Sequence, residues 1–114
     1  MTMDDNKLIE FATREKEDWL MWDISGRLDR TTAGEAAAEG EKLLETTGKL
    51  MMNLKNLEYI SSAGLRAILG LAKKADSAGK VFSICAPSGM VKLVLEEASI
   101  DVFVTVYETE DEME

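Results

Sequence analysis

The sequence contains no histidine and only one cysteine, Cys85. This inventory excludes zinc sites built from clustered His and Cys ligands and nucleophilic sets of the Ser-His-Asp or Cys-His kind. The phosphate-binding patterns Gly-x-x-x-x-Gly-Lys-Ser/Thr and Gly-x-Gly-x-x-Gly are also missing, so nucleotide binding of these kinds has no support. The carboxylates stand mostly on predicted helix surfaces or in the last residues, rather than in an apolar setting suited to acid-base chemistry. We therefore expect no metal, no cofactor and no enzymatic activity.

A lone cysteine cannot form an internal disulfide, and the first residues, MTMDD, lack the basic and apolar regions of a secretory signal. Both features favour the reducing cytoplasm. No apolar run approaches the roughly 18 residues that a membrane-spanning helix needs. We therefore expect a cytoplasmic protein without membrane insertion.

Basic residues are few: 13 Lys and Arg stand against 22 Asp and Glu, for a formal net charge of −9. Such a charge repels phosphate backbones and anionic lipid headgroups, so direct binding of nucleic acid is not expected. Part of the excess lies in residues 108–114, ETEDEME, which we expect to form an acidic, flexible and solvated tail. This segment lacks the spaced ligands and the turn glycine of a calcium loop.

A chain of 114 residues with 46% hydrophobic content fits a single domain with one core, which we expect over residues 1–107. Strands are expected at 7–14, 19–25, 50–54, 81–85 and 102–107, and helices at 32–45, 62–75 and 88–98. This order, β-β-α-β-α-β-α-β, predicts an α/β fold. Helices should pack on a mixed sheet, because right-handed crossovers make successive strands mostly parallel.

Side-chain periodicity supports these elements. One face of the second strand carries Leu20, Trp22 and Ile24. The expected inward stripes are Leu65, Ile68, Leu69 and Ala72 in the second helix and Val91, Val94, Leu95 and Ala98 in the third. Thr32 and Glu35 have the spacing of a capping box, and Ser88 is placed to cap the third helix.

The most informative stretch runs from Asn53 to Arg66, where a buried strand leads into a helix that begins with two serines. A helix start leaves backbone N–H groups unpaired and carries about half a positive charge, so a phosphate is electrostatically favoured there. Taken alone, Ser62 would be an N-cap and Asp29 a turn residue or a helix-start acid. A functional interpretation of these two residues needs a second motif elsewhere in the sequence.

Residues 59–66, YISSAGLR, resemble the phosphorylation-site signature of anti-sigma factor antagonists of the STAS domain family. Residues 26–29, GRLD, resemble a second motif of that family, Gly-x-Leu-Asp, at the expected distance upstream. The order of elements from Leu8 to Tyr107 is similar as well. The resemblance thus covers nearly the whole chain and implies a STAS-like mixed sheet.

Residue by residue, the resemblance gives Ser62 the position of the serine that the family's kinase phosphorylates. Asp29 takes the position of the acidic residue in the loop beside that serine. The resemblance implies a partner-binding surface formed by Asp29, Ser61, Ala63, Gly64, Leu65 and Arg66. Two positions depart from the common pattern, since Ser61 stands where many relatives have Asp and Ala63 where many have Ser or Thr. The first change makes Ser61 an alternate phosphate acceptor.

The implied function is that of a partner switch. The unphosphorylated form would bind an anti-sigma factor, itself a serine kinase, and release the sigma factor. Phosphorylation of Ser62 would abolish binding, and a phosphatase would close the cycle. Two alternatives stay open: a STAS subunit of a stress-signalling scaffold or lipid-transport complex without phosphorylation, and a binder of a small anion or nucleotide at the same helix start. Weak homodimerisation stays open too.

Overall fold

The computed structural model describes residues 8–112 and has the expected order of strands and helices. The strands are β1 Ile9–Lys16, β2 Trp19–Leu28, β3 Lys49–Ile60, β4 Val81–Cys85 and β5 Thr105–Tyr107. The helices are α1 Ala33–Thr46, α2 Ser62–Ser77 and α3 Gly89–Glu97, and short 3-10 turns cover Ile100–Val102 and Glu110–Glu112. The predicted α/β architecture is confirmed.

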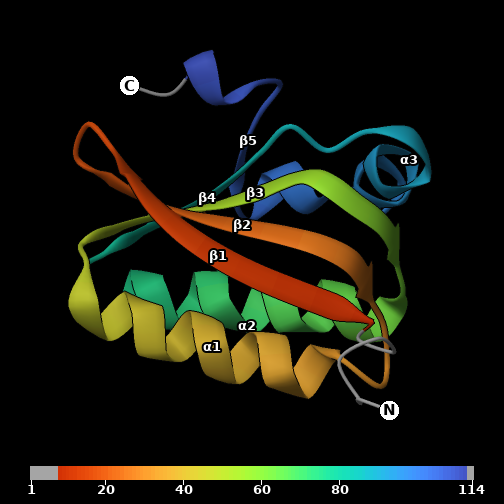
Figure 1. Cartoon of the computed structure of the whole chain (residues 1–114), viewed down its shortest axis with the longest axis horizontal. Helices are drawn as coiled ribbons and strands as arrows, with labels where there is room; N and C mark the ends of the chain where they lie inside the picture. Colours follow the sequence, from red (N-terminus) through yellow and green to blue (C-terminus); the bar gives the residue numbers. More distant parts are fainter. Residues whose placement is uncertain (1–7, 113–114) are drawn as a thin grey trace, which may run out of the picture.

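The strands form one sheet in the order β1-β2-β3-β4-β5. β1 runs antiparallel to β2, and the other neighbours are parallel, as the alternation of strands and helices predicts. Helices α1 and α2 lie side by side along one face of the sheet, and α3 and the 3-10 turn Glu110–Glu112 lie on its other side (Figure 1). Among residues 8–112 no helix combines the length and apolar character needed to cross a bilayer.

Two buried clusters hold the layers together. The larger one joins the sheet to the helices, with Trp22 and Leu50 packed together with Ile68 and Leu71. The smaller one consists of Trp19, Met21, Met51 and Cys85, with Ala86 and Tyr107 packed against it. We expected only one face of β2 to be apolar, but burial of Trp19 and Met21 shows that residues of both faces are covered there.

The last strand is shorter than predicted. It begins at Thr105 rather than Val102, because residues 100–102 form a 3-10 turn that buries Ile100 and leaves Val102 and Phe103 72% and 63% exposed. The inward position predicted for Ala98 is also wrong, since this residue is exposed at the end of α3. The central strand extends beyond the predicted Leu54 to Ile60.

The capping box predicted at Thr32 and Glu35 does not form. Thr32 is the N-cap residue of α1, but its side chain makes no capping bond. Its hydroxyl instead donates to the Arg27 carbonyl at 2.8 Å and accepts from the Asp29 N–H at 2.9 Å. Ser88 likewise precedes α3 without a side-chain capping bond. The hydroxyl of Thr32 therefore closes the loop after β2.

The acidic residues after β5 contact the sheet. We expected 108–114 to form a flexible, solvated tail, of which residues 113 and 114 lie outside the described residues. Within the described part, the carboxylate of Glu110 is within hydrogen-bond distance of Arg14 and Lys16 on β1. The Asp111 carboxylate accepts a further bond from Lys16 at 3.0 Å. Opposite charges distant in sequence thus hold part of this segment against the sheet.

Candidate functional site

The two sequence motifs lie next to each other in the structure. The parallel register of β2 and β3 places Arg27 beside Tyr59 and Leu28 beside Ile60. One residue further, the Ser61 N–H donates to the Leu28 carbonyl at 3.0 Å. The ends of β2 and β3 therefore carry both motifs to the point where α2 begins.

Gly64 allows α2 to begin so close to the end of β2. This glycine is buried, and a Cβ atom there would lie 2.6 Å from the Leu28 carbonyl oxygen and 2.8 Å from Cγ1 of Ile60. Any larger residue would have to push the helix away from backbone atoms. Gly64 was predicted as a partner-binding residue, and its burial means that it contributes by seating the helix.

The N-cap of α2 is Ser61, not Ser62. Ser61 has the extended conformation of a capping residue, with φ −108° and ψ 179°, and its side-chain oxygen accepts from the Gly64 N–H at 3.5 Å. Ser62 is the first residue of the helix and is exposed. The interpretation of Ser62 as only a cap is therefore wrong, and its hydroxyl lies at the protein surface where helical N–H groups are unpaired.

Asp29 is held by its own loop. Its carboxylate accepts from the Thr31 hydroxyl at 2.8 Å and from the Thr31 N–H at 3.0 Å. The bond from the Thr31 hydroxyl is the largest influence on the Asp29 carboxyl and lowers its pKa. Desolvation raises the pKa, but the hydrogen bonds outweigh it and hold the pKa below its usual range. Asp29 is therefore a fixed negative charge in the loop that the Ser61–Leu28 bond ties to the start of α2.

Arg27 belongs to the same surface, although it was not among the predicted site residues. Its guanidinium lies 4.3 Å from the centre of the Tyr59 ring and its Nε is 3.4 Å from the Asp29 carboxylate. Such stacking stabilises an arginine and fixes its orientation. The signal that could have found it is the parallel pairing of the two motifs, which makes Arg27 and Tyr59 neighbours.

The remaining predicted residues differ in exposure. Arg66 is exposed one turn after Ser62, and residues four apart lie on the same side of a helix. Ala63 is half-buried, and the half-buried Leu65 packs against the main core. Among residues 8–112 no group of three or more potential ligand side chains is placed to hold a metal ion. The site thus presents a hydroxyl, a helix N-terminus and charged side chains of both signs.

A protein-family model, that of the STAS domain, matches residues 10–113. The anti-sigma F factor antagonist of Paenibacillus polymyxa is 25% identical over 89 residues, which are 76% of each chain. An anti-sigma factor antagonist of Mycobacterium paratuberculosis has a similar structure, with a TM-score of 0.80, 18% identity and coverage of 90% of this chain and 88% of that one.

The anti-sigma factor antagonist SpoIIAA, a Bacillus cell fate determinant, has been solved in two forms. The unphosphorylated form matches with a TM-score of 0.72 and 17% identity, over 90% of this chain and 91% of that one. The phosphorylated form matches with a TM-score of 0.66 and 16% identity, over 90% and 95%. Because the STAS family model matches residues 10–113 and the fold brings both motifs together, the chain belongs to the STAS domain family.

Proposed function

We propose that this protein is an anti-sigma factor antagonist controlled by phosphorylation of Ser62. Its unphosphorylated form binds an anti-sigma factor that is also a serine kinase, and this binding releases the sigma factor. Phosphorylation by that kinase ends the complex, and a phosphatase restores it. The protein acts in the cytoplasm as a binding partner rather than as an enzyme. The observation that carries the proposal is the exposed position of Ser62 at the first residue of α2, beside the Asp29 loop.

The acceptor is Ser62 rather than Ser61. The Ser61 side chain is half-buried and accepts the capping bond from Gly64, whereas Ser62 is exposed. Transfer of a phosphoryl group to Ser61 would put a bulky dianion where the cap is made. A phosphate on Ser62 would instead project from the first turn, where the helix dipole favours it by about 0.3 to 1 kcal/mol.

The switch acts on the interface and not on the fold. A phosphate adds about −1.5 to −2 charges and three acceptor oxygens. Because the first turn of α2 accommodates an anion, the domain stays folded. In a contact formed by Ser62, Arg66 and the Asp29 loop, the same charge would be desolvated or placed against carboxylates, at a cost of about 2 to 5 kcal/mol. That cost is enough to separate the partners.

The test is intact-mass analysis after incubation with the cognate anti-sigma factor and ATP. Wild type and Ser61→Ala should each gain one phosphate, and Ser62→Ala should gain none. Ser88→Ala, which changes a serine before α3, is the matched control and should behave as wild type. Phosphorylation of Ser62→Ala to the wild-type extent, or no phosphate on wild type, would reject Ser62 as the acceptor and favour a STAS subunit without a phosphorylation cycle.

A further inference from the structure

A second surface lies at the other end of the sheet from Ser62. We call it the cationic face because it carries Arg14 and Lys16 on β1. Beside these two residues it includes the buried side chains of the next three strands, Met21, Met51 and Cys85. Arg14 and Lys16 pair with Met21 and Trp19 near the start of β2, whereas Ser62 follows the end of β3. The length of the parallel strands therefore separates the cationic face from the surface around Ser62.

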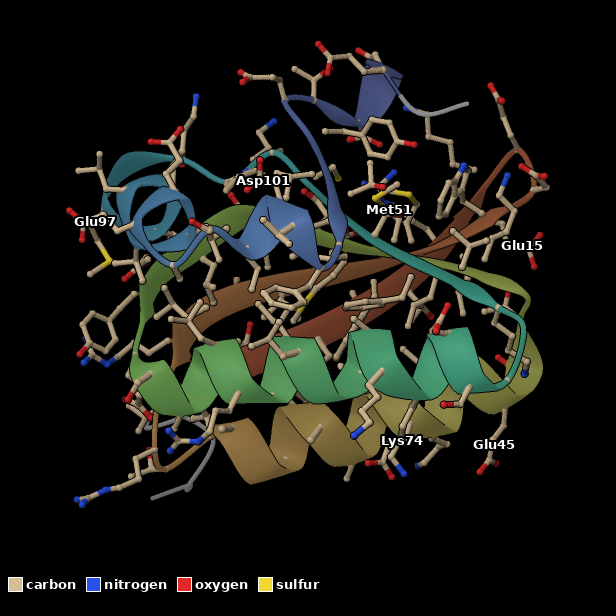
Figure 2. The ribbon with its side chains drawn as sticks, turned by 180° about the vertical axis from the view of Figure 1, so that it is seen from behind. Glu15, Glu45, Met51, Lys74, Glu97 and Asp101 are labelled. Carbon is tan, nitrogen blue, oxygen red and sulfur yellow. The ribbon has the colours of Figure 1, made fainter. Side chains whose placement is uncertain are left out.

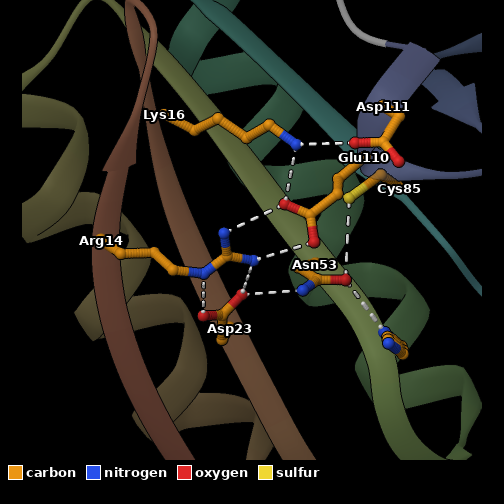
Figure 3. A network of polar contacts seen from close by, with 8 residues as sticks. Arg14, Lys16, Asp23, Asn53, Cys85, Glu110 and Asp111 are labelled. Atoms are coloured by element: carbon orange, nitrogen blue, oxygen red, sulfur yellow. Dashed lines mark hydrogen bonds and ion pairs between the residues drawn. The ribbon is translucent and has the colours of Figure 1, made fainter.

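The chain's own last residues cover the cationic face. Arg14 donates to both carboxylate oxygens of Glu110, at 3.0 and 3.2 Å, and Lys16 donates to Glu110 at 3.2 Å and to Asp111 at 3.0 Å (Figure 3). A bidentate arginine pair of this kind selects a carboxylate by geometry as well as by charge. The contact between Arg14 and Glu110 is therefore specific for a carboxylate at that position.

The sheet itself also holds Arg14 in place. Its Nε and Nη2 donate to the Asp23 carboxylate at 2.7 and 3.1 Å. Asp23 in turn accepts from the Asn53 amide at 2.7 Å, and the Asn53 oxygen is bonded to the Lys55 N–H at 3.1 Å. These bonds come from the sheet alone, so they would orient the guanidinium in the same way without Glu110. The receptor side of the contact is thus preorganised.

An aromatic side chain accompanies the carboxylates. Tyr107 pairs with Cys85 across β5 and β4 and packs against the cluster of Met21, Met51 and Cys85. Met51 lies on the side of the sheet away from α1 and α2 (Figure 2), and Met21, Met51 and Cys85 are all fully buried. The covering segment therefore combines one aromatic ring with carboxylates three and four positions later.

The attachment of this segment is weak. β5 has three residues and lies at the edge of the sheet. The side chains of Arg14 and Asp111 are 41% and 87% exposed, and those of Lys16 and Glu110 are 28% exposed. Partly exposed ion pairs contribute about 0 to 1 kcal/mol each, and the bidentate Arg14–Glu110 pair belongs at the upper end of that range. A segment held by one short strand and such pairs opens at a low free-energy cost.

We propose that the cationic face is a docking surface for an acidic segment of a partner protein, an aromatic residue followed by carboxylates, and that residues 107–111 occupy it in the free chain. Charge complementarity supports this occupant: Arg14 and Lys16 stand together in a chain of net charge −9, and Asp23 offsets only one of these two positive charges. The partner's segment replaces Tyr107, Glu110 and Asp111 contact for contact. This proposal does not depend on phosphorylation, because the surface lies away from Ser62.

The test uses a fluorescein-labelled peptide of residues 105–114 and the full chain. In wild type the attached segment competes at an effective concentration of about millimolar, so the free peptide should bind poorly. The double variant Glu110→Gln, Asp111→Asn weakens the cover and should bind the peptide at least about tenfold more tightly by fluorescence anisotropy, a difference of about 1.4 kcal/mol. Adding Arg14→Gln should remove most of this gain.

Glu108→Gln is the matched control. Glu108 belongs to the same acidic segment, but its carboxylate pairs with Lys92 at 3.5 Å and not with β1, so this variant should bind the peptide no better than wild type. A scrambled peptide of the same composition should bind the double variant at least about tenfold more weakly than the native peptide. Equal binding of the two peptides, or equal binding by wild type and the double variant, would overturn the proposal.

The native Cys85 gives a second readout that does not depend on the labelled peptide. It is the only cysteine, is fully buried, and belongs to the cluster against which Tyr107 packs. The rate of its reaction with a maleimide therefore reports how often the segment opens. The rate should be at least about tenfold higher in the double variant than in Glu108→Gln, and the free peptide should lower it again. An unchanged rate in the double variant would contradict a displaceable cover.

Discussion

The backbone N–H of Ser61 donates to the carbonyl of Leu28 at 3.0 Å. This bond joins two segments that are far apart in the sequence, the end of β2 with its Asp29 loop and the cap of α2. Gly64 lies over the same carbonyl, with room for no Cβ atom. The bond and the glycine together make the loop and the helix start one surface, and the following predictions test that arrangement.

Gly64→Ala should destabilise the domain. The new Cβ atom would lie 2.6 Å from the Leu28 oxygen, and relieving such overpacking costs typically about 1 to 3 kcal/mol. Gly70→Ala is the control in the same helix, where a Cβ meets nothing within 4 Å. It should stabilise by up to about 1 kcal/mol, because alanine is the better helix former. Urea unfolding of both variants measures the change in the free energy of unfolding, which should be a loss for Gly64→Ala and a gain for Gly70→Ala.

Ser61→Ala should cost more stability than Ser62→Ala. Only Ser61 makes the capping bond, and loss of an N-cap costs about 0.5 to 2 kcal/mol. Since the oxygen is 3.5 Å from the Gly64 nitrogen, we expect a loss near the lower end of that range. Ser62 is exposed, and its replacement should change the free energy of unfolding by less than about 0.5 kcal/mol. Equal losses in thermal or urea unfolding would argue against Ser61 as the cap.

Ser62→Asp should weaken binding of the cognate anti-sigma factor. A negative charge placed in a desolvated contact costs at least about 2 kcal/mol, or roughly a thirtyfold increase in Kd. Ser88→Asp puts the same charge before α3 and should leave Kd within about twofold of wild type. Titration calorimetry of the two variants measures both values. An unchanged Kd for Ser62→Asp would mean that this end of α2 is not in the interface.

Acid should weaken the contact between the acidic segment and β1. The hydrogen bond from Arg14 has the largest effect on the pKa of Glu110. Together with the bond from Lys16, it holds this pKa below its ordinary value of 4.5. Burial raises the pKa of Asp23, but hydrogen bonds from Arg14 and Asn53 outweigh it and lower the pKa overall. The lowered values mean that both carboxylates stabilise the folded state above their ordinary pKa values. That stability is lost as the pH falls from about 4.5 through the lowered values.

Unfolding free energies measured between neutral pH and pH 3 check this sign. The loss on acidification should be smaller in Glu110→Gln, because this variant has no carboxylate to protonate at that position. Glu108→Gln is the control for removing a carboxylate from the same segment, since its side chain pairs with Lys92 and not with Arg14 or Lys16. A Glu110→Gln curve parallel to wild type would contradict a role for this carboxylate.

The regular elements could be predicted because their signals are local. The alternation around Trp22 predicts β2, and the helical spacing of Leu65, Ile68 and Ala72 predicts α2, nearly as the structure has them. The pairing of the two motifs also follows from the order of elements, since parallel strands bring their carboxyl ends to one edge. The general surroundings of Ser62 were therefore predictable.

The details that were wrong depend on neighbours distant in the chain or on backbone angles. Which of two adjacent serines caps α2 is decided by the extended conformation of Ser61, and periodicity cannot show this. The hydroxyl of Thr32 serves the Asp29 loop instead of the helix. The contact of Glu110 with Arg14 joins residues at opposite ends of the sequence, and charge alone does not predict which pairs meet.

The first-turn position of Ser62 also bears on how a kinase would recognise it. The residue is already helical, and the bond from the Ser61 N–H to the Leu28 carbonyl ties the start of its helix to the end of another strand and the Asp29 loop. Under the proposed function, a kinase would read an assembled three-dimensional epitope rather than a linear consensus. An isolated octapeptide spanning 59–66 would lack that epitope, so unfolded or newly synthesised chains should escape modification until the domain has folded.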